Sequence, residues 1–412
     1  MDKLKLSLVV TSIAICTQAV LNLPMIVIVG LISIAMLWLS YRDLIYYTIF
    51  LLPFTWHIPG YIILILYALL LIKGRNHGVN IWQIFPPLIL ALLEVFHLSM
   101  YEFSYSYEGV ISICSFIALF FYLLFLDKRD IQASYIVKLF CYGTIVSLLL
   151  SYYLQIDSIG WDIVIEGGVR SGIIEESDGY DEVFLLNANS AAYFAITAFA
   201  CLMLGRDKLK LTKVEYIILL FTSLGCGLLS YSRTFIIVSC LVILLTLLVS
   251  KGNKKIYYFL SIAIVALLVF WIEGDRLYDV YMHRFNEDNI STVGGRSVIF
   301  KKYNDFWLDN PRDVIFGIGV KYYSQYSGIV NSMHNGIQQV YVCFGIVGFI
   351  IYAMSIIKFY NSFCHRKTLS LIYYIPIIAC FIFDQSIQFL NPQFLMFPFI
   401  GAAYALKIRD NE

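Results

Sequence analysis

Charged residues are scarce in this sequence. Only 14% of its 412 residues are Asp, Glu, Lys or Arg, whereas 60% are hydrophobic. A soluble domain usually contains about 25% charged residues, because its surface must be hydrated. The composition therefore excludes a soluble globular protein and predicts a membrane protein with many spans. The net charge is only +1, and nucleic acid is not expected among the partners.

The nine cysteines lack the arrangements that mark disulfides or metal sites. Eight of them fall in apolar stretches, and Cys364 falls in a basic loop. None lies in a segment that we place outside the membrane, and no group has the spacing of metal ligands. We therefore expect neither a disulfide framework nor a metal, and no cofactor.

Long apolar runs predict the fold class. A spanning helix needs about 20 apolar residues, and long unbroken runs exclude a membrane β-barrel, the other structure that satisfies its own backbone in lipid. We predict an all-α polytopic protein with about 12 to 14 transmembrane helices. The stretch 43–73 leaves the number open, because Pro53 and Pro59 could make it one kinked helix or a re-entrant pair. The predicted spans are 5–22, 24–40, 43–57, 60–73, 81–98, 109–126, 131–155, 188–205, 214–229, 234–250, 256–272, 336–360, 369–388 and 393–407.

The distribution of lysine and arginine predicts the topology. With both termini in the cytoplasm, the inner segments hold most of the basic residues and the short outer turns hold almost none. The whole chain, 1–412, then forms a single membrane domain with two long outer segments, 156–187 and 273–335. Basic residues on the outer side are exceptions to the rule and are candidates for function. They are Arg170, Arg233, Arg276, Arg284, Arg296, Lys301, Lys302, Arg312 and Lys321.

Each exception also has an ordinary explanation. Arg170 lies in an acidic loop, where it could pair with a neighbouring carboxylate. Arg233 lies at the mouth of an otherwise uncharged helix, where it could reach the interface; a charge near the membrane centre costs about 2.5 to 3.5 kcal/mol on insertion scales. Residues 296–309 place Ile299, Tyr303 and Phe306 on one helical face, which predicts a helix lying on the membrane surface with solvated lysines. Asn310-Pro311 should end that helix.

The long outer segment returns to the membrane at His334-Asn335. An isolated histidine at an interface is often only structural, but its position just before an uncharged helix favours a function. Imidazole can take or give a proton near neutral pH, and guanidinium groups bind diphosphate oxygens in forked pairs. Arginines and a histidine on one side of a membrane therefore suit glycosyl transfer from a diphosphate-linked sugar without a metal.

Four sequence pieces occur in the order found in one family. They are GGVRSG with NANSAAYFA, SYSRTFIIV, GGRSVIFKKYNDFWLDNPRDVIFGIGV and HNGIQQVYVCFGIVGFIIY. Over residues 165–352 the chain resembles the O-antigen ligase and polymerase superfamily of bacterial envelope glycan assembly. One departure concerns NANS, where Ala188 replaces the usual proline before Asn189.

The resemblance implies a metal-independent inverting glycosyltransferase of the GT-C kind in the cytoplasmic (inner) membrane. Its substrate would be an undecaprenyl-diphosphate-linked oligosaccharide at the outer face, with membrane lipid around it. Arg170, Arg233 and Arg296 would bind the diphosphate, and His334 would activate the acceptor hydroxyl. Asn189 and Asn335 would support the site. A chain-length regulator and a flippase are the protein partners it suggests.

Three functions remain open at this point. A polymerase would join repeat units into O-antigen, capsular or exopolysaccharide; a ligase would transfer the glycan to lipid A-core; a flippase would move lipid-linked oligosaccharide. Transporters place ionisable groups near the midplane, often in repeated halves. We find no repeat, and the charges deep in predicted spans are Glu94, Lys138, Glu215 and Asp384, most of them near an end. We favour the polymerase, because such enzymes serve both Gram-negative and Gram-positive cells.

Overall fold

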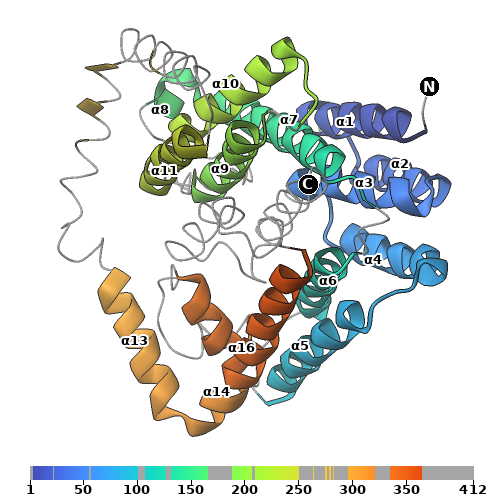
Figure 1. The fold of residues 1–412 in the computed structure, drawn as a ribbon, viewed down its shortest axis with the longest axis vertical. Coiled ribbons are helices and arrows are strands. Elements are labelled where there is room, and N and C mark those ends of the chain that lie inside the picture. Colours follow the sequence, from blue (N-terminus) through green and yellow to red (C-terminus); the bar gives the residue numbers. More distant parts are fainter. Residues whose placement is uncertain are drawn as a thin grey trace. The chain divides into compact units, whose positions relative to one another are not determined.

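A computed structural model describes the helical framework of the chain (Figure 1). The described residues are 3–21, 23–54, 57–100, 107–126, 131–165, 188–206, 209–249, 296–320 and 335–363, with 263, 274–275, 278–279 and 282. All the elements formed by these residues are helical, as the sequence predicts. They are α1 (Lys3–Leu21), α2 (Met25–Trp38), α3 (Tyr41–Leu51), η1 (Leu52–Phe54), α4 (Tyr61–Gly74), η2 (Arg75–His77), α5 (Ile81–Met100), α6 (Tyr107–Leu124), α7 (Ala133–Ile159), α8 (Trp161–Ile165), α9 (Ala188–Gly205), α10 (Lys213–Leu229), α11 (Arg233–Val249), α13 (Arg296–Asp309), α14 (Pro311–Phe316) and α16 (Gly336–Phe363).

The predicted spans agree with these helices wherever the structure describes them. The stretch 43–73 forms two helices, α3 and α4, rather than one kinked helix, and η1 extends α3 through Pro53. Predicted spans 256–272, 369–388 and 393–407 lie outside the described residues. By length and composition, 4 of the described helical segments can cross a membrane: Lys3–Leu21, Ile81–Met100, Ser134–Ser158 and Gly336–Ser355. The fold is that of an all-α polytopic membrane protein.

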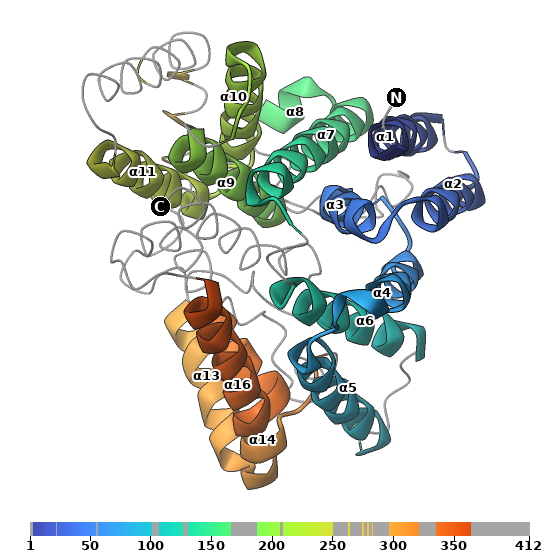
Figure 2. The ribbon, with the colours of Figure 1, turned by 45° about the vertical axis from the view of Figure 1, so that its right-hand side comes forward.

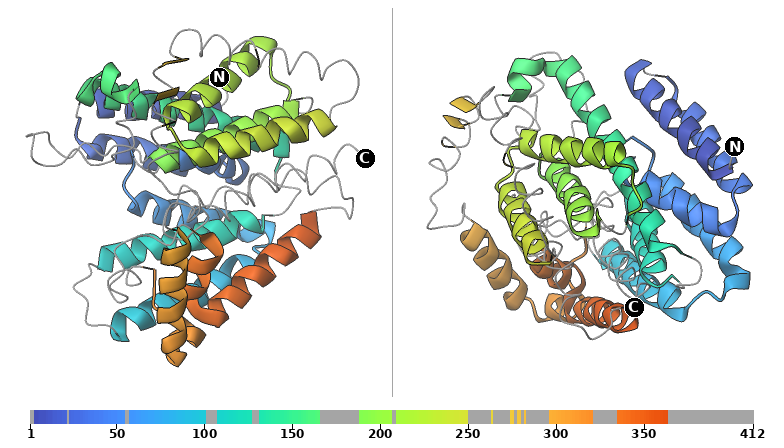
Figure 3. Two further views of the ribbon diagram at one scale, coloured as in Figure 1. Left: turned by 90° about the vertical axis from the view of Figure 1, so that its left-hand side faces the viewer. Right: turned by 45° about the horizontal axis from the view of Figure 1, so that its top comes forward.

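The chain divides into two compact units. One comprises Leu148–Ser297, in which α9 packs against α10 and α11 (Figure 3). Thr212 and Glu215 form a capping box that starts α10. Where α10 meets α11, a Cβ on Gly227 would lie 1.9 Å from the Phe235 ring, so only glycine permits this close approach.

The other unit comprises Met1–Ser147 and Val298–Glu412. Within it, α6 packs against α4 and α5, and α16 packs against α5 and α14 (Figure 2). Asn80 helps to begin α5, because its side-chain oxygen accepts the N–H of Trp82 at 3.0 Å. Described residues from early and late parts of the sequence thus form one packed body, which places residues 316 and 320 beside α5.

Helix α16 is interrupted at Gly345, whose φ of 64° and ψ of -167° are not helical. A Cβ at this position would lie 2.2 Å from the carbonyl oxygen of Ile315 in α14. Gly317, with φ of 78°, makes the reciprocal approach: its Cβ would lie 2.3 Å from the carbonyl group of Cys343. Two glycines therefore allow the backbone after α14 to lie directly against the broken part of α16.

We predict that Gly345→Ala destabilises the protein by at least about 2 kcal/mol, because alanine is strained at this φ and meets the Ile315 carbonyl. Gly30→Ala is the matched control, since a Cβ in α2 would meet nothing within 4 Å. Thermal unfolding of the two variants in the same detergent compares them. Equal unfolding temperatures for Gly345→Ala and the parent chain would contradict the packing described here.

Candidate functional site

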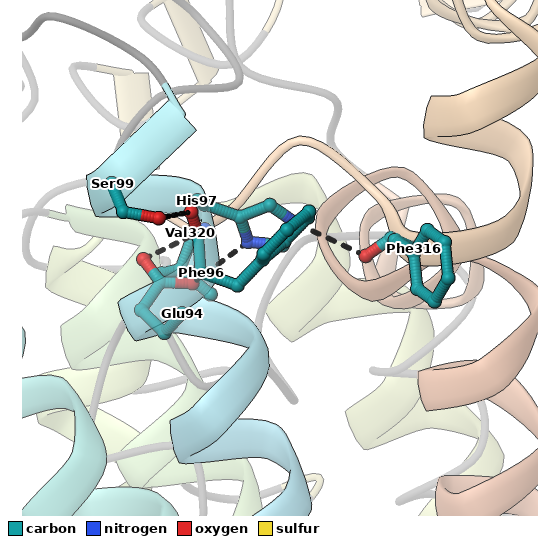
Figure 4. Close-up of polar contacts among 6 residues, drawn as sticks. All are labelled: Glu94, Phe96, His97, Ser99, Phe316 and Val320. Atoms are coloured by element: carbon teal, nitrogen blue, oxygen red, sulfur yellow. Dashed lines mark hydrogen bonds and ion pairs between the residues drawn. The ribbon is translucent and has the colours of Figure 1, made fainter.

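Helix α5 contains a fully buried charged residue, Glu94, which lies one turn before His97. Both side chains have a relative exposure of 0%, and they belong to a helix that is otherwise apolar enough to span a membrane. Figure 4 shows both residues reaching from α5 toward the chain that follows α14. The Glu94 carboxylate accepts the backbone N–H of Val320 with both oxygens, at 3.1 and 3.0 Å.

The same segment is held at its other end by His97. Its Nε2 lies 3.1 Å from the carbonyl oxygen of Phe316 (Figure 4). A carbonyl oxygen can only accept, so this contact requires the proton on Nε2. Nδ1 then faces Glu94, with 3.8 Å between Nδ1 and Oε2. Glu94 and His97 thus bind the backbone at residues 320 and 316. We call residues 317–320 the anchored segment.

Every backbone N–H in the anchored segment has an acceptor. Gly317 donates to the Asp313 carbonyl at 2.8 Å, while Ile318 and Gly319 donate to the carbonyls of Val342 and Cys343, each at 2.9 Å. These two carbonyls precede the break at Gly345, where a continuous helix would have used them internally. Val320, the last donor, is the one that binds Glu94. The anchored segment and the broken helix therefore satisfy each other's backbone, as burial requires.

Helix α13 is attached to α16 through uncharged polar side chains. Gln338 donates from Nε2 to the Phe300 carbonyl at 2.7 Å and to Asn304 Oδ1 at 3.4 Å. The Tyr341 hydroxyl donates to the same Asn304 oxygen. The rings of Trp307 and Tyr341 pack at an interplanar angle of 48°, with 4.8 Å between their centroids. The start of α16 therefore carries a cluster of amides and aromatic rings with no charge.

The predicted apolar face of α13 is partly turned toward the protein: Tyr303 has an exposure of 0%, and Ile299 and Phe306 are half-buried. That this helix lies on the membrane surface stays a prediction. The lysines, Lys301 and Lys302, are exposed as predicted. The helix ends at Asp309, also as predicted, but Pro311 immediately begins the short helix α14. Sequence periodicity identified the helix, but could not distinguish a protein partner from a lipid one.

The predicted site residues fall into three groups. Arg170 and His334 lie outside the described residues. Arg233 and Arg296 are the first residues of α11 and α13, and Asn189 lies in the first turn of α9, but their side chains are outside the description. Asn335 is fully placed: its Oδ1 accepts the Gln338 N–H at 3.0 Å, and its carbonyl accepts the Gln339 N–H at 3.1 Å. Asn335 therefore caps α16, and the structure does not itself bring the predicted residues together.

The turn before Arg233 is locally strained. Tyr231 adopts φ of 48° although it is not glycine, and it is buried at 1% exposure. The turn is supported by Ser230, whose hydroxyl donates to the Gly227 carbonyl at 2.6 Å and accepts the Ser232 N–H at 3.3 Å. A left-handed non-glycine residue costs about 1 to 3 kcal/mol, and such residues gather at functional sites. The strained turn sets the start of α11, whose first residue is Arg233.

Glu94 and His97 were not among the predicted site residues. The sequence marks Glu94 only as one of the few charges deep in a predicted span. The signal that could have found the pair is its spacing: two ionisable residues three apart on an apolar helix lie on one face. Their partners, residues 316 and 320, are more than 200 positions away and could not be read from the sequence.

The fold and these contacts define a polytopic α-helical membrane protein with a broken late helix. The family comparison agrees with this class: residues 218–353 match the family model described as O-antigen ligase. Over these residues the match supports the resemblance to the O-antigen ligase and polymerase superfamily that the motifs indicated. No curated protein and no solved structure matched it.

The matched region contains most of the site described above. It runs from within α10 to within α16 and includes Arg233, Arg296, His334, Asn335 and the anchored segment. Arg170 and Asn189 precede it, as does Glu94. Members of this superfamily are membrane enzymes of the glycosyltransferase kind that act on lipid-linked glycans. Within the described residues no cluster of His, Cys, Asp and Glu could hold a metal ion.

We predict that Glu94→Leu releases the anchored segment, because the buried Val320 N–H loses its acceptor at a cost of about 1 to 3 kcal/mol. Glu94→Gln keeps an amide oxygen for that N–H and should have a smaller effect. Hydrogen–deuterium exchange of a peptide covering residues 317–320 measures the release directly. Faster exchange is expected in the leucine variant.

Gln83→Leu provides the control for this experiment. It also removes a buried polar side chain from α5, but its partners are the Tyr122 carbonyl, at 2.9 Å, and the Asn80 N–H, at 2.7 Å, and not the anchored segment. Its exchange at residues 317–320 should match the parent protein. Identical protection in Glu94→Leu would show that Glu94 does not hold this backbone.

Proposed function

We propose that this protein polymerises undecaprenyl-diphosphate-linked oligosaccharide repeat units into O-antigen, capsular or exopolysaccharide. The reaction takes place at the outer face of the cytoplasmic membrane, with both termini in the cytoplasm. The observation that carries the proposal is the O-antigen ligase match over 218–353, which encloses two candidate arginines and the candidate histidine.

The positions of the arginines support a role in binding diphosphate. Arg233 and Arg296 each occupy the first position of a helix, α11 and α13 respectively. Helix N-termini present unsatisfied N–H groups and a partial positive charge, so they favour anions. A guanidinium group at this place adds a forked pair of donors for phosphate oxygens. Arg170, in the preceding outer loop, is the third proposed diphosphate ligand.

The proposed reaction is a direct displacement at the anomeric carbon. His334 takes the proton of the acceptor sugar hydroxyl as that oxygen attacks the carbon from the face opposite the diphosphate. The bond from carbon to diphosphate oxygen breaks, and the arginines neutralise the charge that develops on the leaving group. The products are undecaprenyl diphosphate and a glycan that is longer by the transferred oligosaccharide. The configuration at the new linkage is inverted. Asn335 contributes by fixing the start of α16 next to His334.

The polymerase is favoured over the ligase because polymerases of this type occur in both Gram-negative and Gram-positive envelopes, whereas lipid A-core is restricted to the former. A ligase would use the same groups with a different acceptor. A flippase delivering the substrate and a regulator of chain length are the proposed protein partners.

Arg233→Ala should abolish polymer formation, because the leaving diphosphate loses its main cationic ligand. Arg75→Ala is a matched control: Arg75 is exposed in η2 and lies in a segment predicted to be cytoplasmic. The measurement is the length distribution of the surface glycan in cells expressing equal amounts of each inserted variant. Normal chain length in Arg233→Ala would remove this residue from the site.

His334→Gln should reduce transfer by roughly 100-fold or more, since positioned proton transfer contributes about that much to rate. A single-turnover assay with purified protein and lipid-linked repeat units measures the chemical step. The residual rate of His334→Gln should also lose the dependence on pH that a titrating base confers. Full activity of both His334→Gln and His334→Ala would leave His334 a structural residue at most.

A further inference from the structure

Two adjacent glutamines in the first turn of α16 are placed very differently. Gln338 is buried and uses its Nε2 to hold α13, as described above. Gln339 is also buried, at 1% exposure, but neither its Nε2 nor its Oε1 has a hydrogen-bond partner in the structure. The Oε1 of Gln338 likewise has none. Three polar atoms on two neighbouring side chains are thus removed from water without compensation.

Such a group is expensive to retain for structure alone. A buried amide that makes no hydrogen bond costs about 1 to 3 kcal/mol, and most buried polar atoms in folded proteins have partners. An apolar side chain of the same length would avoid this cost. A glutamine with both ends unused therefore indicates a partner that binds from outside the chain.

The surroundings of Gln339 indicate the chemistry of that partner. Gln339 lies one turn before Cys343 and therefore on the same face of α16. The backbone carbonyl of Cys343 accepts a hydrogen bond from the anchored segment. Its neighbour in the sequence, Gln338, contacts another neutral amide, Asn304, which also accepts a hydrogen bond from Tyr341. An amide offers both donors and acceptors, which matches a sugar hydroxyl that also donates and accepts. A diphosphate would instead require cations.

We infer that Gln339, together with the free oxygen of Gln338, forms a binding subsite for hydroxyl groups of the glycan. It recognises a sugar residue of the glycan, whereas the proposed role of the arginines is to bind the diphosphate. The inference rests on the proposed function for its substrate class. It adds that different residues bind different parts of the substrate: the arginines bind its charged diphosphate, and the glutamines bind its uncharged hydroxyl groups.

Gln339→Met tests the inference, because methionine keeps the length and helix propensity of glutamine without its hydrogen bonds. The purified full chain in lipid nanodiscs should unfold at the same temperature as the parent or higher, since no protein hydrogen bond is lost. Its KM for the lipid-linked repeat unit should rise roughly tenfold, with little change in kcat, because two neutral hydrogen bonds to substrate are lost.

Gln338→Met is the matched control. It removes the hydrogen bond from Nε2 to Phe300 and should lower the unfolding temperature. If Gln339→Met lowers that temperature as much, the amide has a structural partner such as a fixed water, and the subsite is wrong. An unchanged KM in an active Gln339→Met enzyme would also overturn it.

A binding measurement separates this inference from the proposed reaction. The free repeat-unit oligosaccharide of the host's surface polysaccharide should raise the unfolding temperature of the parent protein but not of Gln339→Met. Inorganic diphosphate should affect both proteins equally. If the parent chain transfers no glycan but shows this pattern, the subsite stands and the polymerase proposal fails. If the oligosaccharide stabilises both proteins alike, the subsite fails even when transfer occurs.

Discussion

The structure around the candidate site depends on one constraint: backbone polar groups in an apolar surrounding must find partners within the protein. Helix α16 breaks at Gly345, so the carbonyls of Val342 and Cys343 need donors from elsewhere. The anchored segment supplies them, and its last N–H is received by Glu94 of α5. The broken helix, the anchored segment and the buried carboxylate therefore depend on one another, since each supplies hydrogen-bond partners for polar groups that another leaves unpaired.

This arrangement explains why an ionisable pair is kept inside an apolar helix. A carboxylate in the membrane interior is costly, and such residues usually serve a function. Here Glu94 and His97 bind the backbone at two points, residues 320 and 316, and so fix the path of the chain as it leaves α14. Rigid support of this kind is what a functional site needs from the elements that carry it.

The sequence predicted the helices well because each consists of an apolar run that nothing else in the chain imitates. It also located the helix at residues 296–309 and its end before Pro311. It could not predict the Glu94 contacts, since they join α5 to residues more than 200 positions later and leave no local pattern. The break at Gly345 was hidden for a similar reason: glycine is frequent in membrane helices, and only the approach of Ile315 shows why this one matters. The roles of Arg170 and His334 remain predictions from residue type and family motif.

The proposed site would combine two kinds of recognition, and all its members except Arg170 and Asn189 belong to the matched region. Arginines at helix starts suit a diphosphate, and the neutral amides at the start of α16 suit sugar hydroxyls. A polymerase needs both, because its donor and its acceptor are glycans carried on the same charged lipid. The most direct test of this account is an analysis of the lipid-linked glycans that accumulate in cells lacking the protein. Single repeat units on undecaprenyl diphosphate, exposed at the outer face of the membrane, are the predicted result. Long chains stranded on that lipid would contradict the account and indicate a ligase, and units confined to the inner face would indicate a flippase.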